Sequence, residues 1–89
     1  MSAYQVNKLC HRLYHDRSLR DAVKVDPAKA IADWPLSDAE RTALLTGDVK
    51  RLYESGVHPF LLGHITRWDL FGVTAATYAE RIKDAKDPN

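Results

Sequence analysis

The stretch SDAERTALLTGDVKRLYESGVHP, residues 37–59, alternates residues that start helices with residues that end them. Ser37, followed at the third position by Glu40, predicts a capping box, in which the hydroxyl and the carboxylate satisfy two free backbone amides of the first turn. Gly47 and Gly56 are each expected to end a helix, because glycine adopts the left-handed conformation at the least cost. The stretch therefore predicts two short helices that meet almost end to end.

Upstream of this stretch, the sequence predicts three further helices. The first covers about residues 3–16, where apolar residues recur at three- and four-residue steps and form a core-facing stripe. Ser18 is expected to cap a second helix that runs to Val25. Asp26 before Pro27 predicts the start of a third, because proline is favoured at the first helical position. The stripe of the first helix consists of Tyr4, Val6, Leu9, Cys10, Leu13 and Tyr14.

Downstream, Pro59 predicts the start of the most apolar helix, which is expected to end at Gly72. Its apolar residues span more than one face, so it is either central or buries a second face against a partner. Thr74 is expected to cap a last helix, and the tail after it, residues 83–89, is expected to fray. Because almost nothing alternates with the period of a strand, the chain is predicted to be all-α, a single compact domain over residues 1–89 with about five to seven short helices. The apolar residues of the long helix are Phe60, Leu61, Leu62, Ile65, Trp68 and Leu70.

The length and net charge of the chain limit the kinds of partner that it is expected to bind. A chain of 89 residues is too short for two separate cores, and a hydrophobic content of 45% with 28% charged residues is typical of a globular domain. Thirteen Lys and Arg against twelve Asp and Glu leave a net charge of +1. That balance provides no excess field for a polyphosphate or an anionic membrane, so neither nucleic acid nor a membrane is expected as a partner.

The single cysteine and the hydropathy of the chain indicate in which cellular compartment the protein is expected. Cys10 is the only cysteine and cannot close an internal disulfide, which fits a reducing cytoplasm. No apolar run approaches the roughly 20 residues needed to span a bilayer. The polar start MSAYQVNKLCHR has no hydrophobic signal core, so the chain is expected to be cytoplasmic, neither exported nor anchored.

The four histidines raise the possibility of a metal site. His11 and His15 are spaced to share one helix face, and His58 and His64 flank the start of the apolar helix. No third ligand lies in register with either pair, and such histidines are more often surface or core residues. The sequence therefore favours no metal in this chain.

Two other chemistries are also disfavoured. Neither Cys10 nor a serine has the glycine-rich elbow or other local signature of a nucleophile, so no catalytic residue is predicted. The helix pair around Gly47 has the outline of a helix-turn-helix motif. However, its second helix begins with Asp48 as the expected cap and carries only Lys50 and Arg51 as basic residues, which disfavours DNA binding.

A more informative feature is the junction between the second short helix and the apolar helix, which we name the 53–61 corner. Apolar and aromatic residues gather there around a glycine turn, where a loop tip would ordinarily be polar. They are either core residues of a tight helix corner or a patch that faces a partner or substrate. The corner comprises Tyr53, Gly56, Val57, His58, Pro59, Phe60 and Leu61.

The run from Leu36 to Leu62 resembles the small-subunit family of protocatechuate 4,5-dioxygenase, the LigAB type. The shared pattern is an acid-rich helix start, a Leu pair, Gly-Asp, Leu-Tyr, Gly-Val-His-Pro and a second Leu pair. The resemblance extends more loosely from the first helix to Tyr78. The chain is shorter than many members, and its length is similar to that of the small structural subunits of aminobiphenyldiol dioxygenases.

The resemblance implies a non-catalytic helical subunit of an extradiol (meta-cleavage) dioxygenase. In that family the small subunit packs on a large catalytic subunit and helps to cover its active site, and a heterotetramer is the expected assembly. The large subunit holds a non-haem Fe(II) through two His and one carboxylate and opens a catechol-type ring with dioxygen. The resemblance therefore implies that this chain holds no cofactor and that the 53–61 corner lies near the active-site mouth. The alternative is a stand-alone helical protein- or peptide-binding module, because the domain also resembles substrate-binding domains of some peptide-modifying systems.

Overall fold

A computed structural model describes residues 3–86, and these residues form seven α-helices and one short 3-10 helix without a strand. The prediction of an all-α fold of short helices is confirmed. None of the described helices is long and apolar enough to cross a membrane. The elements in chain order are α1 (Tyr4–His15), α2 (Arg17–Val25), α3 (Pro27–Ala30), α4 (Asp38–Thr46), α5 (Val49–Glu54), α6 (Pro59–Arg67), η1 (Leu70–Gly72) and α7 (Ala75–Ile82).

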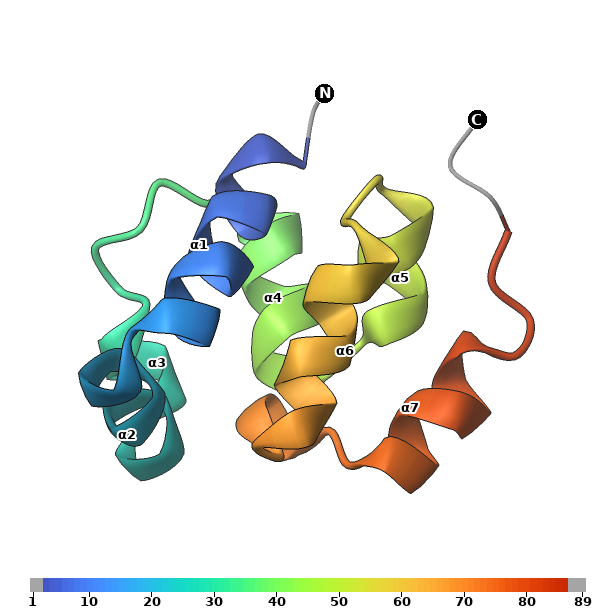
Figure 1. The fold of residues 1–89 in the computed structure, drawn as a ribbon. Helices are drawn as coiled ribbons and strands as arrows, with labels where there is room; N and C mark the ends of the chain where they lie inside the picture. The colour runs from blue at the N-terminus through green and yellow to red at the C-terminus, as the bar shows by residue number, and fades with distance from the viewer. Residues whose placement is uncertain (1–2, 87–89) are drawn as a thin grey trace.

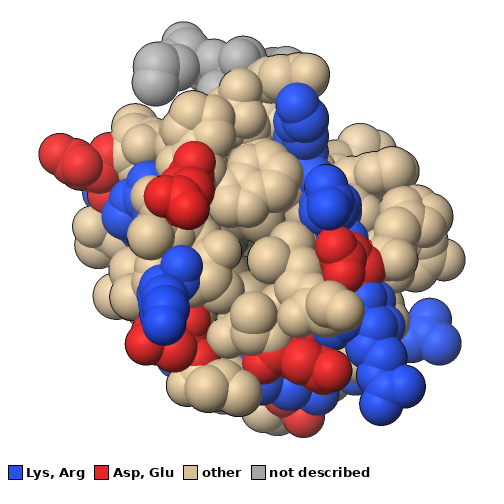
Figure 2. Space-filling view, turned by 90° about the vertical axis from the view of Figure 1, so that its left-hand side faces the viewer, with Lys and Arg blue, Asp and Glu red and all other residues tan. Residues whose placement is uncertain are grey.

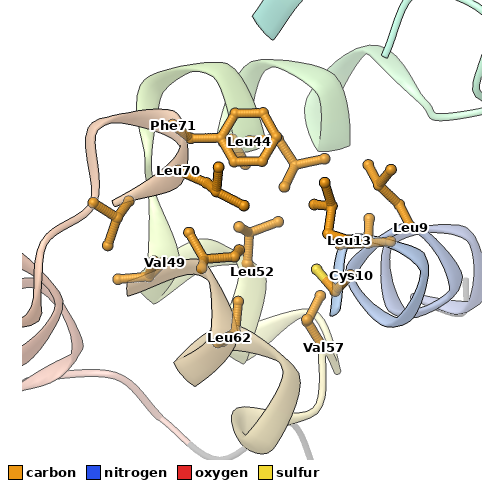
Figure 3. Close-up of a cluster of buried hydrophobic side chains, with 14 of the residues drawn as sticks. Leu9, Cys10, Leu13, Leu44, Val49, Leu52, Val57, Leu62, Leu70 and Phe71 are labelled. Atoms are coloured by element: carbon orange, nitrogen blue, oxygen red, sulfur yellow. The ribbon is translucent and has the colours of Figure 1, made fainter. Parts of the chain in front are cut away.

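The helices enclose one apolar core. Figure 1 shows α1 and α6 side by side at the front of the view with α4 behind them, and α1 packs directly against α6. Side chains from α1, α4, α5, α6 and η1 converge between these layers (Figure 3). Leu13, Leu44 and Leu62, from three different helices, are almost wholly buried. Removing any of these side chains to alanine would cost about 2–5 kcal/mol of stability.

The helix signals between residues 37 and 56 are confirmed in detail. The hydroxyl of Ser37 accepts a hydrogen bond from the Glu40 amide at 3.1 Å, and the Glu40 carboxylate accepts one from the Ser37 amide at 2.8 Å. Asp48 caps α5 by accepting from the Arg51 amide at 3.1 Å. Gly47 has a φ of 68° and Gly56 a φ of 106°, so both occupy the left-handed conformations that end their helices.

Two predictions for the first helices are wrong. Asp16, and not Ser18, caps α2, because its backbone is extended and its carboxylate accepts from the Leu19 amide at 3.1 Å. In α1, Tyr4 and Tyr14 leave the core, with 59% and 37% of their surfaces exposed. They lie on the flanks of the apolar stripe, so only the four residues at its centre are buried.

The predicted end of the most apolar helix at Gly72 is also wrong. The helix α6 ends at Arg67, and Asp69 and Phe71 adopt positive φ values of 54° and 56°. This backbone turn places Leu70 and Phe71 in the core against α2 and α4. Such conformations cost about 1–3 kcal/mol each, and burial of the two apolar side chains offsets that cost.

The last helix is tied to the centre of the fold. Thr74 caps α7 as predicted, accepting from the Thr77 amide at 3.2 Å. Arg81 of α7 donates to the Gly47 carbonyl at 2.7 Å and so holds α7 against the α4–α5 junction. The predicted fraying of residues 83–89 lies partly outside the described residues.

Candidate functional site

The 53–61 corner has an inward side and an outward side. Gly56 turns the chain out of α5, and Val57 then inserts into the core, with its amide donating to the Leu52 carbonyl at 3.0 Å. His58 and Phe60 lie on the outside, and the Phe60 ring is 64% exposed. Val57 is therefore a core residue of the turn, whereas His58 and Phe60 lie outside the core.

The remaining residues of the corner differ in how far they are exposed to solvent. Tyr53 and Leu61 are half-buried and pack against the core cluster, so each forms part of the base of the corner. Pro59 is exposed at the first position of α6, where its missing amide leaves no unsatisfied donor.

The corner is anchored to α1 through Asn7. The Asn7 side-chain oxygen accepts a hydrogen bond from the His58 amide at 2.8 Å. The side-chain nitrogen of Asn7 donates a second hydrogen bond to the Gly56 carbonyl oxygen, at 3.5 Å. These contacts hold the backbone on both sides of Val57, so the turn is fixed by a residue far away in the sequence.

His58 combines a structural and a potential chemical role. Its Nδ1 accepts a hydrogen bond from the Phe60 amide at 3.1 Å, which caps α6. In the neutral imidazole this bond assigns the proton to Nε2, because the accepting nitrogen carries none. The exposed edge of His58 is therefore a hydrogen-bond donor, and the Phe60 ring stands edge-on to it at 6.4 Å.

Beyond Phe60, the structure reveals a cluster of rings that sequence analysis missed. The Phe60 ring meets His64 edge-on at 4.6 Å, and His64 stacks on Tyr14 of α1 at 4.0 Å. Trp68 closes the cluster 6.2 Å from Tyr14, and the Arg20 guanidinium lies 4.1 Å over its ring. The signal available in the sequence was the four-residue spacing of rings at positions 60, 64 and 68.

His64 is the perturbed member of this cluster. Its Nε2 is buried and has no hydrogen-bond partner among the described residues. Desolvation lowers the pKa of His64 below its ordinary value, and the charges of Arg67 and His15 lower that pKa further. The lowered pKa favours the neutral form of this imidazole, which stacks on the Tyr14 ring.

The histidines do not assemble a metal site in the part of the chain that the structure describes. The His11 and His15 rings lie 4.6 Å apart at an angle of 56°, but no group of three His, Cys, Asp or Glu residues between positions 3 and 86 could hold a metal ion. His58 and His64 are separated by the Phe60 ring, which contacts both.

Cys10 is placed where it cannot act as a nucleophile. The side chain is buried in the core, and desolvation raises the pKa of its thiol to about 12. The thiolate is the reactive form of cysteine, so this thiol is inert at neutral pH.

Comparison with known proteins identifies one family. The family described as "Aromatic-ring-opening dioxygenase LigAB, LigA subunit" matches residues 6–83, a range that includes the whole 53–61 corner and the ring cluster. No curated protein and no solved structure matches the chain.

Proposed function

The chain belongs to the family of LigA subunits of LigAB aromatic-ring-opening dioxygenases, and we propose that its 53–61 corner covers the active site of the large catalytic subunit. Membership in this family implies a large subunit as the partner in a heteromeric dioxygenase. The proposal adds that this chain is the non-catalytic subunit and that the reaction is extradiol cleavage of a catechol-type ring.

The geometry of the corner carries the proposal. Val57 and Asn7 fix the turn from inside, while Phe60 and His58 project outward from it. An exposed phenyl ring on a rigid turn can exclude water from an adjoining pocket. The Nε2–H of His58 can donate a hydrogen bond to a phenolate or carboxylate oxygen of the substrate. Such a bond favours the ionised form of the substrate.

Ring opening with dioxygen in this family is expected to need an iron, for which residues 3–86 offer no set of ligands. Non-haem Fe(II) oxygenases use two His and one carboxylate with open positions, and the described residues do not supply such a set. We therefore assign the Fe(II) to the large subunit. A heterotetramer of two small and two large subunits is the expected assembly.

Reconstitution with the large subunit of the source organism tests the proposal. The chain alone, supplied with Fe(II), should consume no oxygen with catechols, and the reconstituted complex should turn over. Substituting His58 should raise KM or lower kcat in the complex. His58→Asn is the sharper variant, because the Asn side-chain oxygen can still cap α6, whereas His58→Ala removes the cap as well as the imidazole.

Phe60→Ala provides a second probe, because the ring is mostly exposed and its loss should leave the fold intact. Val25→Ala is its matched control, since Val25 is 87% exposed on α2, away from the corner. The proposal is refuted if His58→Asn and Phe60→Ala both support ring cleavage with unchanged kinetics across pH. Robust turnover by the chain alone would refute its accessory role, and failure to bind the large subunit would favour the peptide-binding alternative.

A further inference from the structure

Gly63, in the middle of α6, has no role in this fold that requires glycine. Its backbone is helical rather than left-handed, and it is exposed. Apart from its chain neighbours and the backbone of its own helix, no atom lies within 4 Å of where a Cβ would stand. Glycine inside a helix weakens it relative to alanine. The chain therefore carries a helix-weakening residue at an exposed point of α6, where the missing side chain leaves the helix backbone open to close approach.

Gly63 is flanked by two exposed side chains on the same helix face. Phe60 precedes it by three positions and Arg67 follows it by four, which is the spacing of neighbours on one side of a helix. Phe60 and Arg67 are both exposed, and Arg67 forms no ion pair with any described residue. We name these three residues the α6 stripe.

The stripe lies in the most basic part of the chain. Five of the thirteen Lys and Arg residues, but only one of the twelve Asp and Glu residues, fall in segments 4–20 and 56–68, which also contain all four histidines. That single acid, Asp16, is already engaged by Arg12 at 3.1 Å. Lys and Arg side chains follow one another down the right-hand side of Figure 2 with an acidic group between them, and acidic and basic side chains alternate more closely on its left.

We propose that the α6 stripe is the surface on which the large subunit docks, with a carboxylate-bearing segment of that subunit lying over Gly63 and pairing with Arg67. This inference rests on the proposed function for the identity of the partner. The missing side chain at Gly63 permits close backbone approach, and Phe60 supplies apolar contact. The guanidinium of Arg67 lies 5.4 Å over the Trp68 ring but forms no ion pair with a described residue, so it favours an acidic surface. A second copy of the same face is a poor occupant, because it would bring two sets of cations together.

The test separates docking from catalysis. Gly63→Ala, Gly63→Leu and Arg67→Glu are titrated against the isolated large subunit of the source organism, by calorimetry for Kd and by oxygen uptake for kcat. Gly63→Ala should raise the melting temperature of the isolated chain and yet weaken binding. Gly63→Leu and Arg67→Glu should each raise Kd on the order of tenfold or more, with kcat unchanged at saturating small subunit.

The same experiment includes a control for the effect of charge on binding. Lys50→Glu, a reversal of an exposed charge on α5, should leave Kd within about twofold of the parent at high salt, where long-range steering is screened. Binding of the parent should weaken as salt increases, and this dependence should be reduced in Arg67→Glu.

The docking proposal is overturned, with the proposed function intact, if the parent binds and both Gly63→Leu and Arg67→Glu bind with unchanged Kd. It is also overturned if light scattering shows that the isolated chain is a dimer that Arg67→Glu dissociates, since the stripe is then covered by a second copy. If the parent does not bind the large subunit at all, the proposed function fails first.

Discussion

Asn7 holds His58 across 51 positions of sequence, through a 2.8 Å hydrogen bond from the His58 amide to the Asn7 side-chain oxygen. The bond links the first turn of α1 to the residue that caps α6, so the position of the 53–61 corner depends on α1. A displacement of α1 would therefore shift the exposed imidazole and the Phe60 ring together.

Asn7→Ala should lower the free energy of unfolding by about 1 kcal/mol, because it leaves the His58 amide without its protein acceptor. The amide of His58 should also exchange faster with deuterium than the amides of the α1 core. Urea denaturation and amide exchange measure both effects. Asn7→Asp is the matched control, since its carboxylate can accept the same bond; equal loss in the two variants would contradict the role given to the acceptor.

Gly47→Ala should be much more destabilising than Gly56→Ala, although both residues have positive φ values. The left-handed backbone costs any other residue about 1–2 kcal/mol at either position. A Cβ at Gly47 would in addition lie 2.7 Å from Arg81 Nη1, 2.8 Å from Val73 Cγ2 and 2.9 Å from the Phe71 carbonyl, whereas one at Gly56 meets only the Ala3 Cβ at 3.8 Å. Thermal melts of the two variants compare these costs, and equal shifts would show that the contacts around Gly47 relax freely.

Cys10 should resist alkylation in the native protein at pH 8 and react readily in denaturing urea. Burial both blocks access and raises the pKa of the thiol to about 12, so almost no thiolate is present. Mass spectrometry after iodoacetamide treatment measures the extent. In a Cys10→Ala background, Ser18→Cys places a thiol at an exposed position and should react without urea; comparable native labelling of Cys10 would show that the core opens.

The stability of the protein should fall as the pH drops below 6.5, partly because of His64. The fold lowers the pKa of His64 from 6.5, so between that value and its folded pKa the unfolded chain binds a proton that the folded chain does not. His64→Phe, which keeps a ring against Tyr14, should show a smaller loss of unfolding free energy between pH 7 and pH 5. Above about pH 7.5 the imidazole is largely neutral in both states, so the slopes of the parent and the variant should converge. A steeper acid loss in the variant would contradict the lowered pKa.

The sequence by itself determined the features that depend on neighbouring residues. The capping box of Ser37 and Glu40 and the helix end at Gly47 follow from hydrogen bonds and backbone preferences within a few positions, so a local pattern suffices to predict them. The all-α class follows from the same local signals, and the pattern between residues 36 and 62 carried the resemblance to the family that matches the chain.

Tertiary structure decided the features that depend on competition between distant parts of the chain. The helix α6 ends at Arg67, and not at Gly72, because burying Leu70 and Phe71 in the core outweighs the strain of two left-handed residues. The corner divides into a buried Val57 and an exposed His58 because Asn7 holds the turn from α1, and no local pattern encodes that bond. The ring cluster likewise required α1 and α6 to pack side by side, since only that contact brings Tyr14 onto His64.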